Sequence, residues 1–202
     1  TTAFNNTGLG HGALFDNTTG ASNTAVGYQS LVNNTTASNN TAVGYHAAYS
    51  NTTGAANTAL GMQALYTNNT GANNVSVGVN SMYSNTTGGF NTALGRNALT
   101  ANTTASQNTA VGFEALLANT TGANNVALGT YALDANTTAD SNTAIGRSSL
   151  GTNTTGSYNV ALGYKSLFAN TTGTKNTAVG RESGYSLTTG THNVLLGHQS
   201  GY

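Results

Sequence analysis

Residues 23–39 read NTAVGYQSLVNNTTASN, and residues 40–56 repeat the same order as NTAVGYHAAYSNTTGAA. With the positions of one repeat numbered 1 to 17, position 1 is Asn and position 5 is Gly in all twelve copies, position 4 is always Leu, Val or Ile, and position 14 is Thr wherever a copy reaches it. The glycines of position 5 are Gly10, Gly27, Gly44, Gly61, Gly78, Gly95, Gly112, Gly129, Gly146, Gly163, Gly180 and Gly197. Such a repeat, without insertion or deletion, is typical of a solenoid, in which each coil contacts its neighbours.

The length and content of the repeat indicate which kind of solenoid forms. Helical solenoids use units of about 33 residues or more, whereas 17 residues rich in Thr and Asn and interrupted by Gly favour strands and turns. We therefore predict an all-β fold, a parallel β-solenoid (β-roll or β-helix) of about twelve 17-residue coils, forming a single repeat domain over residues 1–202. Coils about 4.8 Å apart would make a rod of roughly 58 Å. Because both ends fall inside a repeat, we expect a segment of a longer fibre.

Charged side chains are rare in this sequence. Lys and Arg together number 5, Asp and Glu number 5, and the formal net charge is zero, whereas 30 Asn and 37 Thr make up about a third of the chain. A neutral chain has no electrostatic attraction for nucleic acid or for an anionic membrane surface. The absence of Cys excludes disulfides, a thiolate nucleophile and a cysteine metal site. No apolar run approaches the roughly 20 residues of a membrane-spanning helix, so we predict no membrane insertion.

Positions 1–5 predict a short strand with two unlike faces. Alternate side chains of an extended segment share a face, so Thr24 and Val26 lie on one face, and Ala25 and Gly27 lie on the other. The second face holds almost nothing larger than Ala, with Leu195 as the exception. We expect a close neighbour there, either the opposite wall of a narrow coil or another subunit. A small-then-large pair at positions 8 and 9 is predicted to fill the coil interior, and the NTT segment is predicted to turn at the solvent edge.

Two segments, NNTAVGYHA at 39–47 and NNVALGTYA at 124–132, resemble the NSVAIGxxS motif of trimeric autotransporter adhesin heads. The consensus over essentially the whole chain is also similar to the NTAxG repeat arrays of phage tail-fibre-like and bacterial surface fibre proteins. The resemblance implies a left-handed parallel β-roll in which three chains associate around an axis. It places Val26, Val43 and their equivalents toward that axis and the alanines inside the roll.

The sequence offers no pattern typical of catalysis, of a cofactor or of a metal. Glu114 and Glu182 share position 7 but lie four coils, or roughly 19 Å, apart, which is too far for a glycosidase pair at about 5–10 Å. Asp134 and Asp140 are interpreted as solvated loop acids. The histidines have no acid or Cys partner beside them in the sequence; they are His11, His46, His192 and His198. We therefore predict that the protein is not an enzyme and uses no cofactor or metal.

Position 10 carries an aromatic residue in several coils, and Tyr49, Tyr66 and Tyr83 follow one another in consecutive coils. Rings about 4.8 Å apart can stack as offset pairs and stabilise neighbouring coils. The same rings can instead form a contact surface for an adjacent chain or for sugar rings, which pack on aromatic faces. The sequence leaves both interpretations open.

Position 12 begins an N-x-T sequon in almost every coil. The asparagines concerned are Asn17, Asn34, Asn51, Asn68, Asn85, Asn102, Asn119, Asn136, Asn153 and Asn170. Stacked Asn and Thr side chains can form amide and hydroxyl ladders along a solenoid. Alternatively, these Asn or the adjacent Thr carry surface glycans, which would keep an uncharged rod soluble. The two interpretations differ in where the Asn side chain points.

The favoured functional hypothesis is a non-catalytic structural subunit of an extracellular fibre or adhesin-like filament, located on a cell or virion surface. Its expected partners are copies of itself, with a trimer favoured, and possible glycans; nucleic acid is excluded. The first alternative is a module that binds cell-surface carbohydrate or a host receptor through Tyr49, Tyr66 and Tyr83. The second alternative is an ice-binding β-solenoid, which predicts Thr-x-Thr ranks on one flat face; the paired Thr18 and Thr19 are adjacent and point to opposite sides.

Overall fold

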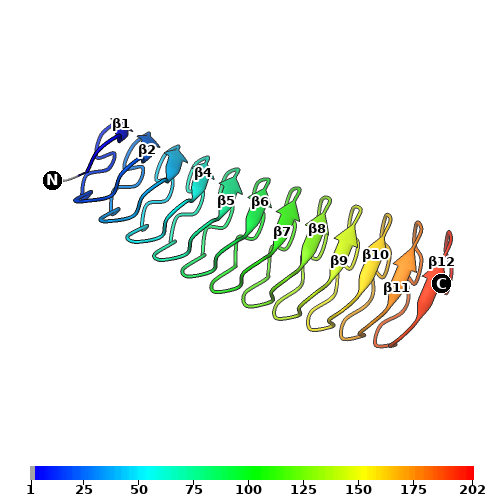
Figure 1. The fold of residues 1–202 in the computed structure, drawn as a ribbon. Helices are drawn as coiled ribbons and strands as arrows, with labels where there is room; N and C mark the ends of the chain where they lie inside the picture. The colour runs from blue at the N-terminus through cyan, green and yellow to red at the C-terminus, as the bar shows by residue number, and fades with distance from the viewer. Residues whose placement is uncertain (1–2) are drawn as a thin grey trace.

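The computed structural model describes residues 3–202, which Figure 1 shows as a row of similar coils. We number these coils from 1, with coil 1 beginning at Asn6 and coil 12 at Asn193. Each coil contains one three-residue strand at positions 2–4. The strands are β1 (Thr7–Leu9), β2 (Thr24–Val26), β3 (Thr41–Val43), β4 (Thr58–Leu60), β5 (Val75–Val77), β6 (Thr92–Leu94), β7 (Thr109–Val111), β8 (Val126–Leu128), β9 (Thr143–Ile145), β10 (Val160–Leu162), β11 (Thr177–Val179) and β12 (Val194–Leu196).

The twelve strands form one parallel sheet in chain order, from β1 to β12. Neighbouring strands pair residues that are 17 apart, so that Ala25 of β2 lies opposite Ala42 of β3. The structure confirms the predicted all-β parallel solenoid with coils stacked in register. None of residues 3–202 lies in a helix, so this part of the chain contains no helix able to cross a bilayer.

A glycine at position 5 is required at the end of every strand. Gly112 has a φ of 135°, a conformation that L side chains rarely adopt. A Cβ atom added to Gly112 would lie 2.6 Å from the carbonyl oxygen of Gly129 in the next coil. Backbone conformation and the close approach of consecutive coils therefore both exclude a side chain in coils 1–11, and in coil 12 the backbone conformation of Gly197 alone favours Gly.

Three further positions of the repeat have backbone angles in the left-handed region, and in most coils these positions are not occupied by glycine. In coil 2, φ is 49° at Gln29, 50° at Leu31 and 63° at Asn39, which occupy positions 7, 9 and 17. This region is a strong outlier for β-branched side chains. Although the chain holds 37 Thr, no Thr, Val or Ile occupies position 7, 9 or 17 in any coil. Selection against β-branched residues at these positions therefore follows from the backbone.

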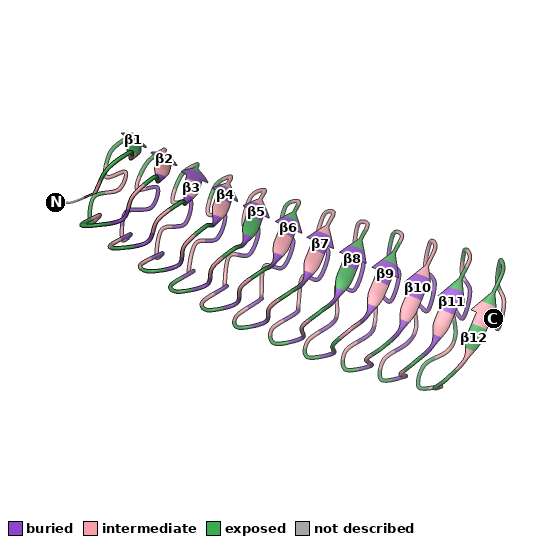
Figure 2. Cartoon of the chain, viewed as in Figure 1, coloured by how far each residue is buried: buried purple, intermediate pink, exposed green. Residues whose placement is uncertain are grey.

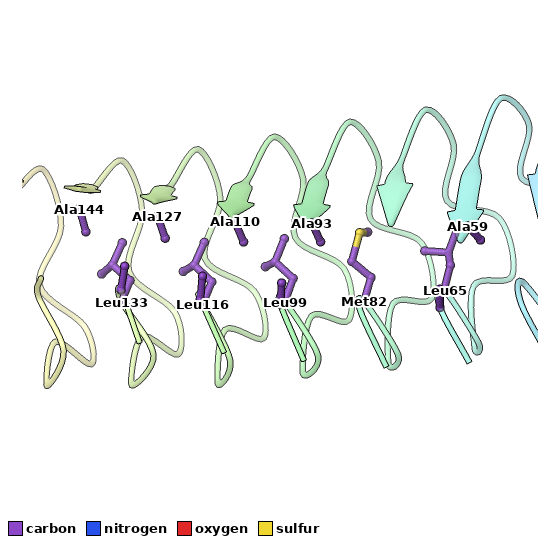
Figure 3. Close-up of a cluster of buried hydrophobic side chains, with 14 of the residues drawn as sticks. Ala59, Leu65, Met82, Ala93, Leu99, Ala110, Leu116, Ala127, Leu133 and Ala144 are labelled. Atoms are coloured by element: carbon purple, nitrogen blue, oxygen red, sulfur yellow. The ribbon is translucent and has the colours of Figure 1, made fainter. Parts of the chain in front are cut away.

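The core consists of small side chains from the strand packed against large side chains from the opposite wall. Ala110 at position 3 and Leu116 at position 9 are both fully buried, and the other middle coils repeat this pair. Figure 3 shows the alanines of the strands pointing toward Leu99, Leu116 and their equivalents. The close neighbour expected beside the small face is therefore the opposite wall of the same coil, and the prediction that positions 8 and 9 fill the interior is confirmed.

The last coils exchange large and small residues across this core. Position 9 is Gly184 in coil 11 and Gly201 in coil 12, whereas position 3 of coil 12 is Leu195. A Cβ on Gly184 would lie 2.8 Å from Cδ1 of Leu195, and a Cβ on Gly201 would lie 2.7 Å from Cδ2 of Leu195. The exceptional Leu195 thus occupies the space that the leucines of position 9 fill elsewhere.

Candidate functional site

The sequon asparagines of position 12 form a continuous ladder inside the coils. Nδ2 of Asn102 donates to Oδ1 of Asn85 in the previous coil at 2.8 Å and to the carbonyl of Ala105 at 3.0 Å. Oδ1 of Asn102 accepts from Nδ2 of Asn119 at 3.2 Å. Each such amide therefore uses both of its hydrogens and closes its own turn while bonding the neighbouring coil.

The asparagines of position 1 form a second ladder, which we did not predict. Nδ2 of Asn108 donates to the carbonyl of Gly122 at 2.9 Å. Its backbone N–H donates to Oδ1 of Asn91 at 2.9 Å, and its own Oδ1 accepts from the backbone N–H of Asn125 at 2.9 Å. Because buried amides need partners, this ladder explains why position 1 is Asn in all twelve coils.

The position-12 ladder bears directly on the predicted glycosylation sites. Nine of the ten sequon asparagines, from Asn34 to Asn170, are fully buried, and Asn17 is partly buried with Nδ2 bonded to the carbonyl of Gly20 at 2.9 Å. An N-linked glycan would replace an Nδ2 hydrogen, and from Asn34 to Asn170 the folded ladder leaves neither a free hydrogen nor space for the sugar. The structure therefore favours the ladder over the glycan at these nine asparagines, and N-glycosylation of Asn17 stays a prediction. The threonines of position 14 are exposed in every coil, and O-glycosylation stays a prediction for them.

The position-12 ladder ends where the asparagine is replaced. Position 12 of coil 11 is Leu187, and Oδ1 of Asn170 in coil 10 has no hydrogen-bond partner among the described residues. This orphaned acceptor is a direct consequence of the substitution, since every earlier asparagine of the ladder accepts from the next coil.

The tyrosines predicted as a contact surface form a stacked row. The ring centroids of Tyr49 and Tyr66 are 5.1 Å apart with an interplanar angle of 16°, and those of Tyr66 and Tyr83 are 5.0 Å apart at 7°. This stacking is one of the two interpretations that the sequence left open. Burial, with smaller contributions from the neighbouring tyrosines, raises the pKa of Tyr66 above its ordinary value. Contact of these rings with another molecule stays a prediction.

His46 joins this row to a second one. Its ring lies 4.8 Å from that of Tyr49 and 3.9 Å from that of Tyr45, which stacks on Tyr28 at 5.5 Å. Nε2 of His46 is 3.0 Å from Oε1 of Gln29. Burial lowers the pKa of His46, which favours the neutral imidazole within the aromatic row.

The titratable groups do not gather into one centre. Glu182 lies 3.1 Å from Arg181, and the hydrogen bond from Gln199 at 3.0 Å is the main cause that lowers the pKa of the Glu182 carboxyl. Burial raises the pKa of Asp134, and the charge of Glu114 adds to the effect. Within residues 3–202, no three His, Asp or Glu side chains are grouped so that they could hold a metal ion.

The outward side of the sheet is uncharged. Its side chains come from positions 2 and 4, and we call this surface the sheet face. Figure 2 colours most of the strands as intermediate or exposed. Position 4 exposes an aliphatic side chain in most coils, with exposed fractions of 45% for Leu94 and 44% for Leu128. Position 2 is Thr or Val, and in the described chain no hydroxyl of these threonines has a hydrogen-bond partner; they are Thr7, Thr24, Thr41, Thr58, Thr92, Thr109, Thr143 and Thr177.

A polar groove of about 490 Å³ runs across coils 1–5 between positions 11 and 13. Sequence reasoning missed it, because it arises only when the turn brings these two rows beside each other. We call it the hydroxyl groove. Its lining residues are Asp16, Asn33, Thr35, Ser50, Thr52, Thr67, Asn69, Thr86 and Thr87.

Comparison with known proteins identifies no relative. The chain matches no protein-family model, no curated protein and no solved structure.

Proposed function

We propose that this chain is a non-catalytic structural segment of an extracellular filament, which associates with copies of itself through the sheet face. The observation that supports the proposal is the row of aliphatic side chains at position 4 of the twelve strands, which are exposed in seven coils and half-buried in the other five. Exposed aliphatic side chains gathered in one row, rather than scattered singly, are typical of an interaction site.

The sheet face suits association with an identical copy. Positions 2 and 4 carry no charged residue in any coil, so two copies can meet without desolvating a charge. Every copy has the same spacing of rows, set by the same strand pairing, and a symmetric assembly brings identical surfaces together. Three chains around one axis is the arrangement that the resemblance to adhesin heads implies.

Ice binding is the second candidate, and the sheet face supports it better than the sequence did. The Thr-x-Thr ranks that ice binding predicts are absent, but Thr at position 2 and an aliphatic residue at position 4 form a Thr-x-aliphatic rank in most coils, as in Thr92 and Leu94. Unpartnered hydroxyls and methyl groups at regular spacing can order water. A sheet face buried between copies could not bind ice, so the two candidates exclude each other at this surface.

Sedimentation velocity with sheet-face variants tests the proposal. We expect the unmodified chain to sediment as an oligomer at micromolar concentration. The double variant Leu94→Glu with Leu128→Glu should sediment as a monomer with an unchanged circular dichroism spectrum, because two buried carboxylates would face an apolar partner.

The matched control is Thr104→Glu with Thr138→Glu, two exposed positions with the same separation of two coils. This control should remain oligomeric. A monomeric unmodified chain would contradict self-association, and thermal hysteresis of that monomer, lost in the glutamate variant of the sheet face, would favour ice binding instead.

A further inference from the structure

We propose that the hydroxyl groove binds a linear, uncharged polysaccharide lying parallel to the rod axis. The groove is open, and it extends over five coils from Asp16 to Thr87. Every residue that lines it is polar, although carbon atoms contribute more of the lining surface than nitrogen and oxygen atoms do. It uses positions 11 and 13 of the repeat, with Thr87 of position 14 at one end, and none of the positions of the sheet face, so a single chain can present both surfaces.

The hydrogen bonds within the groove determine which ligand chemistry it suits. The hydroxyl groups of Thr35 and Thr86 donate to carbonyls of the next coil, at 3.1 Å and 2.9 Å. The hydroxyl of Thr67 donates to the carbonyl of Tyr83 at 2.7 Å, and Nδ2 of Asn33 donates to the carbonyl of Tyr49 at 2.9 Å. With their hydrogens used, the three threonine hydroxyls offer oxygen lone pairs, whereas Nδ2 of Asn33 keeps one hydrogen to donate. Ser50, whose hydroxyl makes no hydrogen bond in the described chain, can both donate and accept. The complementary ligand is therefore rich in hydroxyl groups, which donate and accept as well.

The charge of the groove narrows the class of ligand. Asp16 at one end supplies the one formal charge among the lining residues, and no Lys or Arg lines the groove. An anionic polymer would find no cation to pair with, and a cation would find one carboxylate. Neutral sugars, which donate hydroxyl hydrogens without carrying charge, match this surface best.

The repeat makes the groove suited to a polymer. Position 13 offers the same acceptor from Thr35 and Thr52 in consecutive coils, one strand spacing of about 4.8 Å apart. That distance is close to the length of one sugar unit in an extended 1,4-linked chain. Each sugar of such a chain would therefore meet an equivalent set of acceptors in the next coil.

The polar residues at position 11 that line the groove are found in some coils of the rod and not in others. Position 11 is Asn33, Ser50 and Thr67 in coils 2–4, but coils 6–8 have alanine there, at Ala101, Ala118 and Ala135. Folding therefore does not require a polar residue at this position. The stacked Tyr49, Tyr66 and Tyr83 of position 10 lie in coils 3–5. Coils 6–8 have no aromatic residue at position 10. The polar groove and the tyrosine row thus occupy the same part of the rod.

Calorimetric titration with defined hexasaccharides tests the proposal. The probes are the hexasaccharides of 1,4-linked glucose, xylose and mannose, and the anionic hexamer of galacturonate as the charged comparison. We expect saturable binding of at least one neutral hexasaccharide, with an affinity that is unchanged by salt because no ion pair forms. The variant Asn33→Ala, Ser50→Ala and Thr67→Ala should bind about tenfold more weakly, corresponding to one or two lost hydrogen bonds.

Two controls separate the groove from general effects on folding. The variant Thr152→Ala with Ser186→Ala changes position 11 outside the groove and should keep the affinity. Ser50→Ala alone removes a hydroxyl with no hydrogen bond in the described chain, so it should weaken binding without lowering Tm. Absence of binding at millimolar hexasaccharide, equal losses in the groove and control variants, or binding of galacturonate alone would overturn the proposal. The sheet-face variant Leu94→Glu with Leu128→Glu should still bind the hexasaccharide. A failure of self-association can therefore be told apart from a failure of binding at the groove.

Discussion

Gly112→Ala is expected to lower the free energy of unfolding by at least about 3 kcal/mol. Two effects add at this position. The φ of 135° is unfavourable for any residue with a Cβ, and the new Cβ would lie 2.6 Å from the carbonyl oxygen of Gly129 and 2.7 Å from its carbonyl carbon. Both of these atoms belong to the backbone, so the clash can be relieved only by moving coils 7 and 8 apart. Urea denaturation followed by circular dichroism measures the loss.

Gly197→Ala is the matched control for this variant. Gly197 occupies the same position in coil 12 with a φ of 113°, but no heavy atom lies within 4 Å of the Cβ that the substitution would add. Gly197→Ala should therefore lower the free energy of unfolding only through the unfavourable backbone conformation, by about 1–3 kcal/mol. Equal losses for Gly112→Ala and Gly197→Ala would contradict the close stacking of consecutive coils.

Asn102→Ala is expected to destabilise the chain by about 3–5 kcal/mol, because several buried groups lose partners together. The substitution removes the donor to Oδ1 of Asn85 and to the carbonyl of Ala105, and it removes the acceptor of Nδ2 of Asn119. Asn102 is fully buried, so water cannot replace these partners without opening the coil. The shift of the urea midpoint measures the effect.

The control for the ladder is Asn69→Thr, at position 13, where the other coils carry Thr. Asn69 is exposed, and a surface substitution of this kind is expected to change stability by no more than about 0.5 kcal/mol. If Asn102→Ala lowered the free energy of unfolding as little as Asn69→Thr, the buried amide ladder would not stabilise the coils.

The sequence was sufficient to predict the fold because the repeat has a strict period. Glycines exactly spaced along the chain can lie in one row only if the coils stack in register, and the alternation of Thr24, Ala25 and Val26 identifies the inner and outer faces of the strand. The small inner face was correctly interpreted as a site of close approach, although the sequence did not decide between the opposite wall and another subunit.

Other features could have been found from signals that we did not use. The invariant Asn of position 1 indicated a buried amide ladder, and the exclusion of Thr, Val and Ile from positions 7, 9 and 17 indicated left-handed backbone there. The exchange between Leu195 and Gly184 indicated contact across the core. The hydroxyl groove could not be predicted, because it depends on how the turn places Ser50 beside Thr52 and their equivalents.

Distances between paired spin labels test the stacking of coils in register most directly. The chain has no native Cys, so cysteines can be introduced in pairs at exposed threonines of position 14. The pairs Thr53 with Thr121, Thr53 with Thr155 and Thr19 with Thr172 are four, six and nine coils apart. The account predicts distances of about 19, 29 and 43 Å, in proportion to the number of coils. Distances that do not increase in this proportion would contradict it.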